Sequence, residues 1–247
     1  MNSPEAPYLS IIVPAFNEER RIAATLDSML GYLSAKSFSW EMIIVLDGCS
    51  DNTAAVVAPY AAAHLQIRVI DRKDNHGKGY TVREGILAAR GAIRLFTDAD
   101  NSTDLSHFDR MIPLFDNGAP VVIASRNSRD AKGAGEAVPQ PLHKRMLGTA
   151  GNLMIQCCAV WGVWDTQCGF KAFTAEAAAK VFSKAKICGW GFDIEALALA
   201  RKQHFRIAIV PAHWIDNKET HVTLRSYLSV LLETCKVRWN LVSGAYR

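Results

Sequence analysis

Short apolar runs alternate with amphipathic stretches over the first half of the chain. A short apolar run bounded by turn-forming residues is typical of a buried strand, and apolar residues three or four positions apart are typical of a helix. We expect strands at residues 8–13, 42–46, 67–70, 92–97 and 121–124, the first of them ended by Pro14. We expect helices from about Glu18, after a cap at Asp51 and Asn52, and over residues 79–89. This alternation predicts an α/β fold with a mostly parallel, doubly wound sheet.

Polar segments follow three of the expected strands. They read PAFNEE, LDGCSDNT and TDADNS, and in a doubly wound sheet they lie at the carboxyl ends of the strands, where ligands bind. In the third segment Asp98 and Asp100 are two positions apart, so that on an extended chain both carboxylates face the same side. Like charges this close repel one another unless a cation lies between them. An alternative is a plain loop in which Asp98 is a turn residue and Ser102 or Asp104 caps a helix.

The second half of the chain departs from this alternation. A polar, glycine-rich loop follows Arg126 and extends to Arg145, and loops of this length often carry function. Residues 146–164 are mostly apolar with polar interruptions, which favours a helix that packs or lies on a surface. The tail at residues 226–247 predicts a helix that either docks on the domain or lies in a membrane interface. Its apolar face contains Leu228, Leu231, Leu232 and Cys235.

The composition limits the class of protein. The chain has 247 residues, of which 49% are hydrophobic, as is typical of one globular domain with a sizeable core. A net charge of +4 does not indicate an extended nucleic-acid surface. The six cysteines form no CxxC pair and no zinc-like spacing with histidine, which favours free thiols in a reducing cytoplasm. The sequence has no signal peptide and no stretch of about 20 strongly apolar residues, so we do not expect an integral membrane protein.

Carboxylates dominate the expected strand ends, namely those of Glu18, Asp47, Asp98 and Asp100. Carboxylate oxygens are natural ligands of Mg²⁺ and Mn²⁺, which are also bound through substrate phosphates. The chain has no P-loop consensus, and the GKG at residues 77–79 lacks the GxGxxG spacing of dinucleotide-binding proteins. We therefore expect Mg²⁺ or Mn²⁺ to bridge a nucleotide diphosphate to Asp98 and Asp100.

Six motifs in order resemble those of one enzyme family. They read SIIVPAFNEERRI, IIVLDGCSDNT, NHGKGYTVREGILAARG, DADNST, DTQCGFKAF and WGFDIE. The chain resembles the inverting family 2 glycosyltransferases, and within them the dolichyl-phosphate glucosyl- and mannosyltransferases. The resemblance covers Tyr8 to Arg247 and implies a single Rossmann-like GT-A domain over residues 1–247. It also implies a nucleotide-sugar half at 8–125, an acceptor half at 126–225 and an amphipathic helix at 226–247.

The resemblance implies roles for individual residues. Contacts with the donor nucleotide sugar are expected from Pro14, Phe16, Glu18, Val45, Asp47, Lys78, Asp98 and Ala99. The metal ligands are expected to be Asp98, Asp100 and Ser102, and the acceptor-phosphate contacts Arg126, Lys144 and Arg145. The catalytic set implied is Asp100, Arg126, Arg145 and Asp193. The chain departs from the family where Asp47 is followed by Gly48 and Cys49, and where Thr220 and His221 replace a Ser-Lys pair.

The implied reaction moves glucose or mannose from UDP-glucose or GDP-mannose to a polyprenyl or dolichyl phosphate. We expect a protein attached peripherally to the cytoplasmic face of a membrane, without nucleic-acid partners, and the sequence leaves its oligomeric state open. One alternative is a soluble hydroxyl acceptor with Asp165 or Asp193 as the base. Another is a protein without catalytic activity that binds a nucleotide sugar or a lipid.

Overall fold

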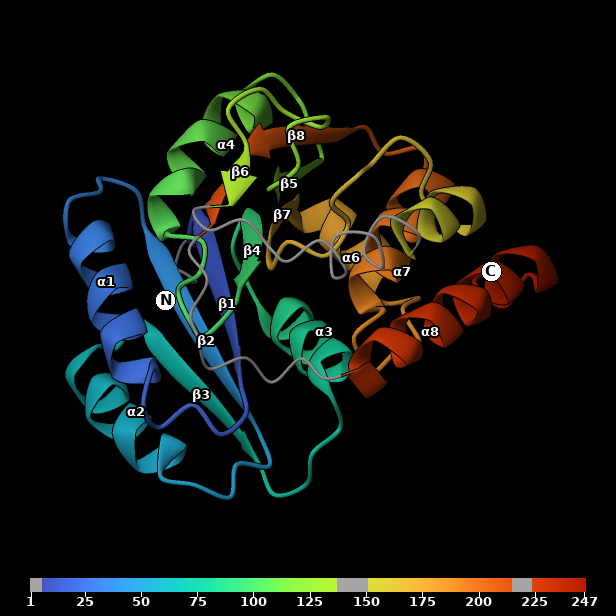
Figure 1. Ribbon diagram of the computed structural model, residues 1–247. Helices are drawn as coiled ribbons and strands as arrows, with labels where there is room; N and C mark the ends of the chain where they lie inside the picture. Colours follow the sequence, from blue (N-terminus) through green and yellow to red (C-terminus); the bar gives the residue numbers. More distant parts are fainter. Residues whose placement is uncertain (1–5, 137–150, 215–223) are drawn as a thin grey trace.

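A computed structural model describes residues 6–136, 151–214 and 224–247 (Figure 1). Within this part of the chain, a seven-stranded sheet has the order β3-β2-β1-β4-β7-β5-β8, and a two-stranded sheet pairs β6 with β9. The large sheet contains β1 (Leu9–Ala15), β2 (Trp40–Asp47), β3 (Ile67–Arg72), β4 (Ile93–Thr97), β5 (Val121–Ser125), β7 (Phe170–Thr174) and β8 (Ile207–Pro211). The small sheet contains β6 (Gly135–Glu136) and β9 (His213–Trp214).

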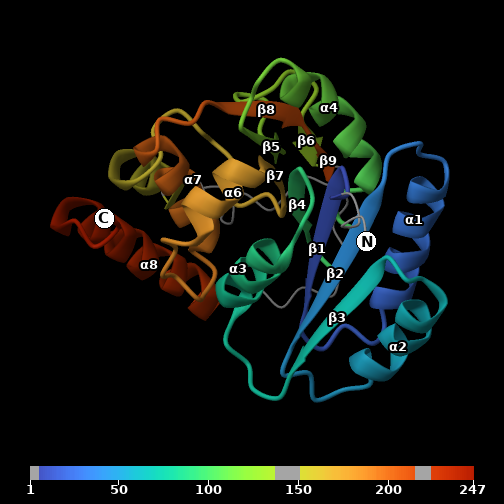
Figure 2. The same ribbon diagram turned by 180° about the vertical axis from the view of Figure 1, so that it is seen from behind.

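Helices cover both faces of the large sheet (Figures 1 and 2). One face packs against α1 (Ile22–Ser34), α2 (Thr53–Ala63) and α4 (Phe108–Asp116). The other packs against α3 (Lys78–Ala88), α6 (Ala175–Phe182) and α7 (Phe192–Lys202), and α8 (Leu224–Ser243) packs outside α7. Residues 151–158 are helical, and a short 3-10 helix (Leu105–His107) precedes α4. The expected α/β fold with a mostly parallel sheet is confirmed.

The end of the first strand and the start of the first helix differ from the expectation. Pro14 does not end β1, which pairs with β2 through Ala15. On its other side β1 pairs with β4 only as far as Ile12, so Pro14 has no partner there that needs its missing N–H. The first helix begins at Ile22, because Glu18 and Arg21 form a turn in which the Glu18 carbonyl accepts from the amides of Arg21 and Ile22.

Two strands of the large sheet, β7 and β8, were not predicted from the sequence pattern. β7 lies antiparallel between β4 and β5, with Lys171 opposite both Phe96 and Ile123. The strand is short, and a lysine stands in its middle, so its local pattern does not resemble a buried strand. Its position is set by its two neighbours, which are more than forty residues away in the sequence. No helix in the described part of the chain has the length and apolar character needed to cross a membrane.

Candidate active site

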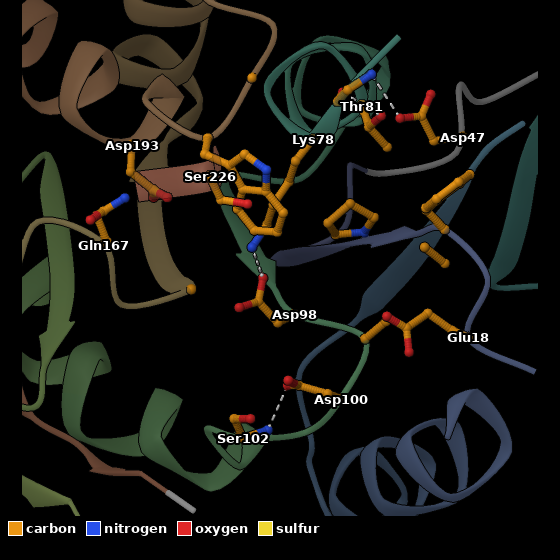
Figure 3. A pocket seen from close by; sticks show the side chains of 18 of the residues that line it. Glu18, Asp47, Lys78, Thr81, Asp98, Asp100, Ser102, Gln167, Asp193 and Ser226 are labelled. Atoms are coloured by element: carbon orange, nitrogen blue, oxygen red, sulfur yellow. Dashed lines mark hydrogen bonds and ion pairs between the residues drawn. The ribbon is translucent and has the colours of Figure 1, made fainter. Parts of the chain in front are cut away.

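A cavity of about 600 Å³ opens at the carboxyl ends of β1, β2 and β4 (Figure 3). Its wall combines anionic, cationic and aromatic side chains from segments far apart in the sequence. The carboxylates are those of Glu18, Asp47, Asp98, Asp100 and Asp193, the cations are Arg21, Lys78 and Arg126, and the aromatic rings are Phe16, Trp190, Trp214 and Tyr227. The cavity therefore brings together most of the residues that the sequence singled out.

The loop after β1 is organised by an ion pair. Arg21 Nε and Nη2 donate to the two carboxylate oxygens of Glu18 at 2.7 and 2.8 Å, and Arg21 Nη1 lies 4.0 Å from Asp100 Oδ2. Glu18 therefore holds Arg21 against the carboxylate of Asp100. Phe16 is half-exposed at the cavity, whereas Asn17 adopts a left-handed φ of 56° and bonds to Ser50 in the loop after β2.

Asp47 is a buried carboxylate that accepts three hydrogen bonds. Arg72 Nη2 and the His76 amide donate to Oδ1 at 2.7 and 2.8 Å, and the Gly77 amide donates to Oδ2 at 2.9 Å. A carboxylate has about four lone-pair positions, so one acceptor position remains. Asp47 thus fixes the segment that leads into α3, and it still lines the cavity. Val45 does not line the cavity, because its side chain is buried in the core below it.

The residues after β4 form the anionic centre of the cavity. β4 ends at Thr97, so Asp98 and Asp100 lie in the turn that follows and not on an extended chain. Their carboxylates point to different partners: Asp98 Oδ1 lies 2.6 Å from Lys78 Nζ, and Asp100 Oδ1 accepts from the Ser102 amide at 3.0 Å (Figure 3). Each acid is thus close to a cation of the chain itself, Lys78 or Arg21, which reduces the repulsion between the two.

In the alternative interpretation of this segment as a plain loop, Ser102 or Asp104 was expected to cap a helix. Asp104 caps the short 3-10 helix by accepting from the Ser106 amide at 2.8 Å. Ser102 does not act as a cap. Its buried hydroxyl has no hydrogen-bond partner among the described residues, and it lines the cavity.

Oxygen ligands suitable for Mg²⁺ or Mn²⁺ are therefore present. The carboxylates of Asp98 and Asp100 and the unpaired hydroxyl of Ser102 are hard donors of the kind that both ions prefer. In the described part of the chain, no group of three or more His, Cys, Asp or Glu side chains could hold a metal alone. A divalent ion at this turn would need further ligands from water or from the phosphates of a substrate.

Asp193, which lines the cavity, forms an ion pair with the buried Lys171. Lys171 Nζ lies 2.5 Å from Asp193 Oδ1 and donates to the Cys168 carbonyl at 2.5 Å, and its side chain is fully buried. Burial raises the pKa of Asp193, although the ammonium groups of Lys171 and Lys78 oppose this effect. Burial also lowers the pKa of Lys78, but the carboxylates of Asp98 and Asp193 outweigh it and leave that pKa raised.

Arg126 reaches the cavity from the end of β5. Its Nε and Nη2 atoms donate to the two oxygens of Asp165, each at 2.8 Å, and its amide donates to the same carboxylate. Burial raises the pKa of Asp165, but the guanidinium of Arg126 outweighs it and holds that pKa below its ordinary value. Asp165 does not line the cavity. It orients Arg126, and this position does not suit the base expected for a hydroxyl acceptor.

Several wall residues were not predicted from the sequence. Arg21, Thr81, Gln167, Gly169, Trp190, Trp214, Ser226 and Tyr227 all line the cavity. Gly169 and Trp190 belong to two of the recognised motifs, but neither residue was given a role of its own. Arg21 lies in the first motif and could have been found as the basic residue three positions after Glu18. Lys144 and Arg145, predicted at the acceptor phosphate, lie outside the described residues.

The fold is that of the GT-A glycosyltransferases. Glucosyl-3-phosphoglycerate synthase from Mycobacterium tuberculosis, solved with Mn²⁺, UDP and glucosyl-3-phosphoglycerate, superimposes with a TM-score of 0.65 at 22% identity. The match covers 94% of this chain and 80% of that one. Mannosyl-3-phosphoglycerate synthase from Rubrobacter xylanophilus gives a TM-score of 0.66 at 16% identity, over 96% and 75% of the two chains.

Sequence comparison defines the family. The family model described as Glycosyl transferase family 2 matches residues 10–182. The dolichyl-phosphate beta-glucosyltransferase of Drosophila melanogaster is 35% identical over 254 residues, which cover 97% of this chain and 77% of that protein. The enzyme of that name from Homo sapiens is 31% identical over 254 residues, with the same two coverages. The chain therefore belongs to glycosyl transferase family 2, as its motifs predicted, and it is a glycosyltransferase.

Proposed function

We propose that the enzyme transfers glucose from UDP-glucose to the phosphate of dolichol or a related polyprenol, with inversion at the sugar carbon and with Mg²⁺ or Mn²⁺. The observation that supports this proposal is the cavity, which is lined by Asp98, Asp100 and Ser102 together with the cations Lys78 and Arg126. The names of the relatives support glucose and dolichyl phosphate. The solved complexes with UDP and either Mn²⁺ or Mg²⁺ support the nucleotide and the metal.

The donor is proposed to lie over the ends of β1, β2 and β4. Phe16 offers a half-exposed ring for the base, and Asp47 has one acceptor position left for the N–H of a uracil. Asp98, Asp100 and Ser102 would hold the divalent ion, which supplies positive charge to the leaving diphosphate. Lys78 lies beside Asp98 and would add its own charge there. This placement supports a donor half at residues 8–125.

The acceptor side is proposed to rely on positioning and charge. A lipid phosphate is already anionic near neutral pH, so its attack on the sugar carbon requires no base. Arg126 has a guanidinium that is fixed by Asp165, which makes it a preorganised partner for phosphate oxygens. Trp190, Asp193 and Trp214 complete this wall, which supports an acceptor half that begins at residue 126.

A hydroxyl acceptor is the second candidate, and the position of Asp193 on the cavity wall favours it. In that reaction Asp193 would remove the proton, and its raised pKa suits a base. However, Lys171 binds the same carboxylate at 2.5 Å and engages one of its oxygens. We therefore place the hydroxyl acceptor second.

We also propose that α8 attaches the enzyme to a membrane surface, where a polyprenyl phosphate resides. Leu228, Leu232, Cys235, Trp239 and Val242 follow one another at spacings of four and three, so they form one stripe along the helix. All five side chains are exposed, Leu232 and Trp239 at 72% each. Leu231, which was expected on this face, is half-buried instead and faces Gly151.

Two further features of α8 support this attachment. Ser226, Tyr227 and Val230 line the cavity, so the stripe and the cavity share one helix. Lys236 and Arg238 are exposed on the same helix and would attract anionic lipids, by roughly 1 kcal/mol for each base near the surface. We propose the cytoplasmic face of the membrane as the site of attachment, because the cysteines favour a reducing compartment.

The test is release of nucleoside diphosphate from UDP-glucose, UDP-galactose, GDP-mannose and GDP-glucose, each with and without polyprenyl phosphate in detergent micelles. We expect release from UDP-glucose that depends on the lipid phosphate and on Mg²⁺ or Mn²⁺. Preference for GDP-mannose would transfer the proposal to the mannosyl branch. Release that requires a soluble sugar or glycerate and ignores the lipid would overturn the acceptor assignment.

A further inference from the structure

The loop between α6 and α7 connects the cavity to the start of α3. Gly189 and Trp190, near the end of this loop, line the cavity. On its other side, the Cys188 carbonyl accepts from the amides of Gly79 and Tyr80 at 2.8 and 3.3 Å. There is no room for a side chain at Gly79, because a Cβ atom there would lie 2.5 Å from the Ile187 carbonyl oxygen. The position of this loop therefore sets the position of the first turn of α3.

The first turn of α3 contains Lys78, whose ammonium lies 2.6 Å from Asp98 Oδ1. The same ammonium lies 5.3 Å from the centre of the Trp190 ring and 6.0 Å from that of Phe192. Lys78 is thus enclosed between the turn after β4 and the α6–α7 loop. A shift of the loop would move both Trp190 and the support of Lys78.

Glu233 on α8 holds this loop from outside. Its Oε2 atom accepts from the Gly191 amide at 2.6 Å. The carboxylate also lies so close to the backbone of Gly189 that a Cβ atom at that position would collide with Oε1. Two glycines of the loop thus make room for one carboxylate of α8. Glu233 is half-buried at this point, and burial raises its pKa.

A second contact with the C-terminal segment fixes the beginning of the loop. The buried carboxylate of Glu195 accepts from the amides of Lys186 and Ile187 at 2.8 to 2.9 Å. The hydroxyl of Tyr246 donates to Glu195 at 2.5 Å. Because residues 186–187 are held in this way, the effect of Glu233 is confined to the glycine-rich end of the loop, which lines the cavity.

We propose that Glu233 is a positioning residue for the active site. It acts through Gly189 and Gly191 to hold the α6–α7 loop, and the loop in turn places Trp190 and Lys78 in the cavity. The same helix carries the exposed stripe, so the element that meets the membrane also sets the geometry of the cavity wall. The expected effects on binding and turnover rest on the proposed function, whereas the effect on the loop does not.

The first test is hydrogen exchange of the ligand-free full chain. Glu233→Ala removes the acceptor for the Gly191 amide, so we expect faster exchange in residues 188–192 and in residues 77–82. Glu233→Asp keeps the charge but shortens the side chain by one methylene, and we expect the same result. Glu233→Gln keeps a carbonyl oxygen at the same reach and should preserve the protection of both segments.

Thr234→Val is the matched control. Among the described residues, its buried hydroxyl bonds only within α8, to the Val230 carbonyl at 2.7 Å, so the substitution perturbs the helix without touching the loop. We expect its exchange to change in α8 alone. Equal exchange of residues 188–192 and 77–82 in wild type, Glu233→Ala and Glu233→Asp would overturn the proposal, as would equal loosening in Thr234→Val.

The second test is calorimetric binding of UDP with Mn²⁺, followed by turnover of UDP-glucose with polyprenyl phosphate. Loss of the hydrogen bond that holds the Gly191 amide predicts a UDP affinity that is weaker by about tenfold in Glu233→Ala. We expect recovery in Glu233→Gln and a midpoint of thermal unfolding close to that of Thr234→Val. Wild-type UDP affinity and turnover in Glu233→Ala would overturn the positioning role. If the wild type itself fails to use these substrates, the proposed function fails and the exchange result still decides the role of Glu233.

Discussion

The carboxylate of Asp98 lies against the backbone of Gly169, so closely that a Cβ atom at position 169 would collide with Asp98 Oδ2. The Asp98 amide also donates to the Gly169 carbonyl at 3.2 Å. Gly169 comes directly before β7, the antiparallel strand beside β4. The glycine of the DTQCGFKAF motif therefore provides the space in which the first acid of the DADNST motif lies.

Gly169→Ala should displace Asp98 and reduce glucosyl transfer while the fold persists. A misplacement of about 1 Å at a reacting centre can cost roughly a hundredfold in rate. The measurement is kcat with saturating donor, together with thermal unfolding. Gly31→Ala is the matched control, because no atom of the described residues lies within 4 Å of a Cβ atom at that position in α1. Equal activity in the two variants would contradict the importance of this contact.

Asp100→Asn should nearly abolish transfer without unfolding the protein. The change keeps the shape of the side chain but removes a negative charge beside Ser102 and Arg21, with an expected loss of several kcal/mol in transition-state stabilisation. Calorimetry should show that Mn²⁺ binding in the presence of UDP is lost as well. Asp109→Asn, which changes a carboxylate paired with Lys36 on the surface of α4, is the control and should behave as wild type. Full wild-type activity in excess EDTA would refute the metal assignment.

Arg126→Lys should weaken use of the lipid phosphate more than binding of the donor. A lysine cannot reproduce the two parallel hydrogen bonds to Asp165 or grip phosphate oxygens in the same way. We expect the KM for polyprenyl phosphate to rise by about tenfold while UDP affinity stays within twofold. The opposite pattern, with weaker UDP binding and an unchanged acceptor KM, would assign Arg126 to the donor.

The ion pair of Asp165 with Arg126 should make stability depend on pH in the acidic range. Because the pKa of Asp165 is lower in the folded protein than in the unfolded chain, the unfolded state binds more protons there. The stabilisation is fully present above the unfolded value of about 3.9 and is lost as the pH falls through the lower folded value. Urea unfolding between pH 6 and pH 3 should therefore show a steeper loss for wild type than for Asp165→Asn. Parallel curves would contradict this linkage.

The exposed stripe of α8 should govern attachment to membranes. The double substitution of Leu228→Glu and Leu232→Glu places two charges on the apolar face and should greatly reduce flotation with anionic vesicles. Leu65→Glu is the control, since Leu65 is 97% exposed in the connection between α2 and β3, away from α8. High salt should weaken binding of the wild type only in part, because apolar burial is not screened. A wild-type protein that never floats would exclude attachment through this helix.

The sequence by itself determined the alternation of strands and helices over residues 8–125, the family, and the position of Asp98 and Asp100 directly after the fourth strand, although not the turn in which they lie. These features depend on local periodicity and on short motifs, which a single segment expresses without reference to the rest of the chain. It also indicated the C-terminal helix, but not which apolar residues face outward. Leu231 is half-buried and Trp239 is exposed. The packing of α8 against α7 determines which side of the helix is covered and which side faces outward.

Only the tertiary structure decided the partners of the charged residues. Arg126 is paired with Asp165, Lys78 with Asp98 and Lys171 with Asp193, over sequence separations of 20 to 39 residues. Such pairs form where the folded chain buries a charge, since an unpaired buried charge is strongly unfavourable. The insertion of β7 between β4 and β5 is of the same kind. The position of β7 depends on packing between segments that are far apart in the sequence, so it cannot be predicted from the local pattern of β7 itself.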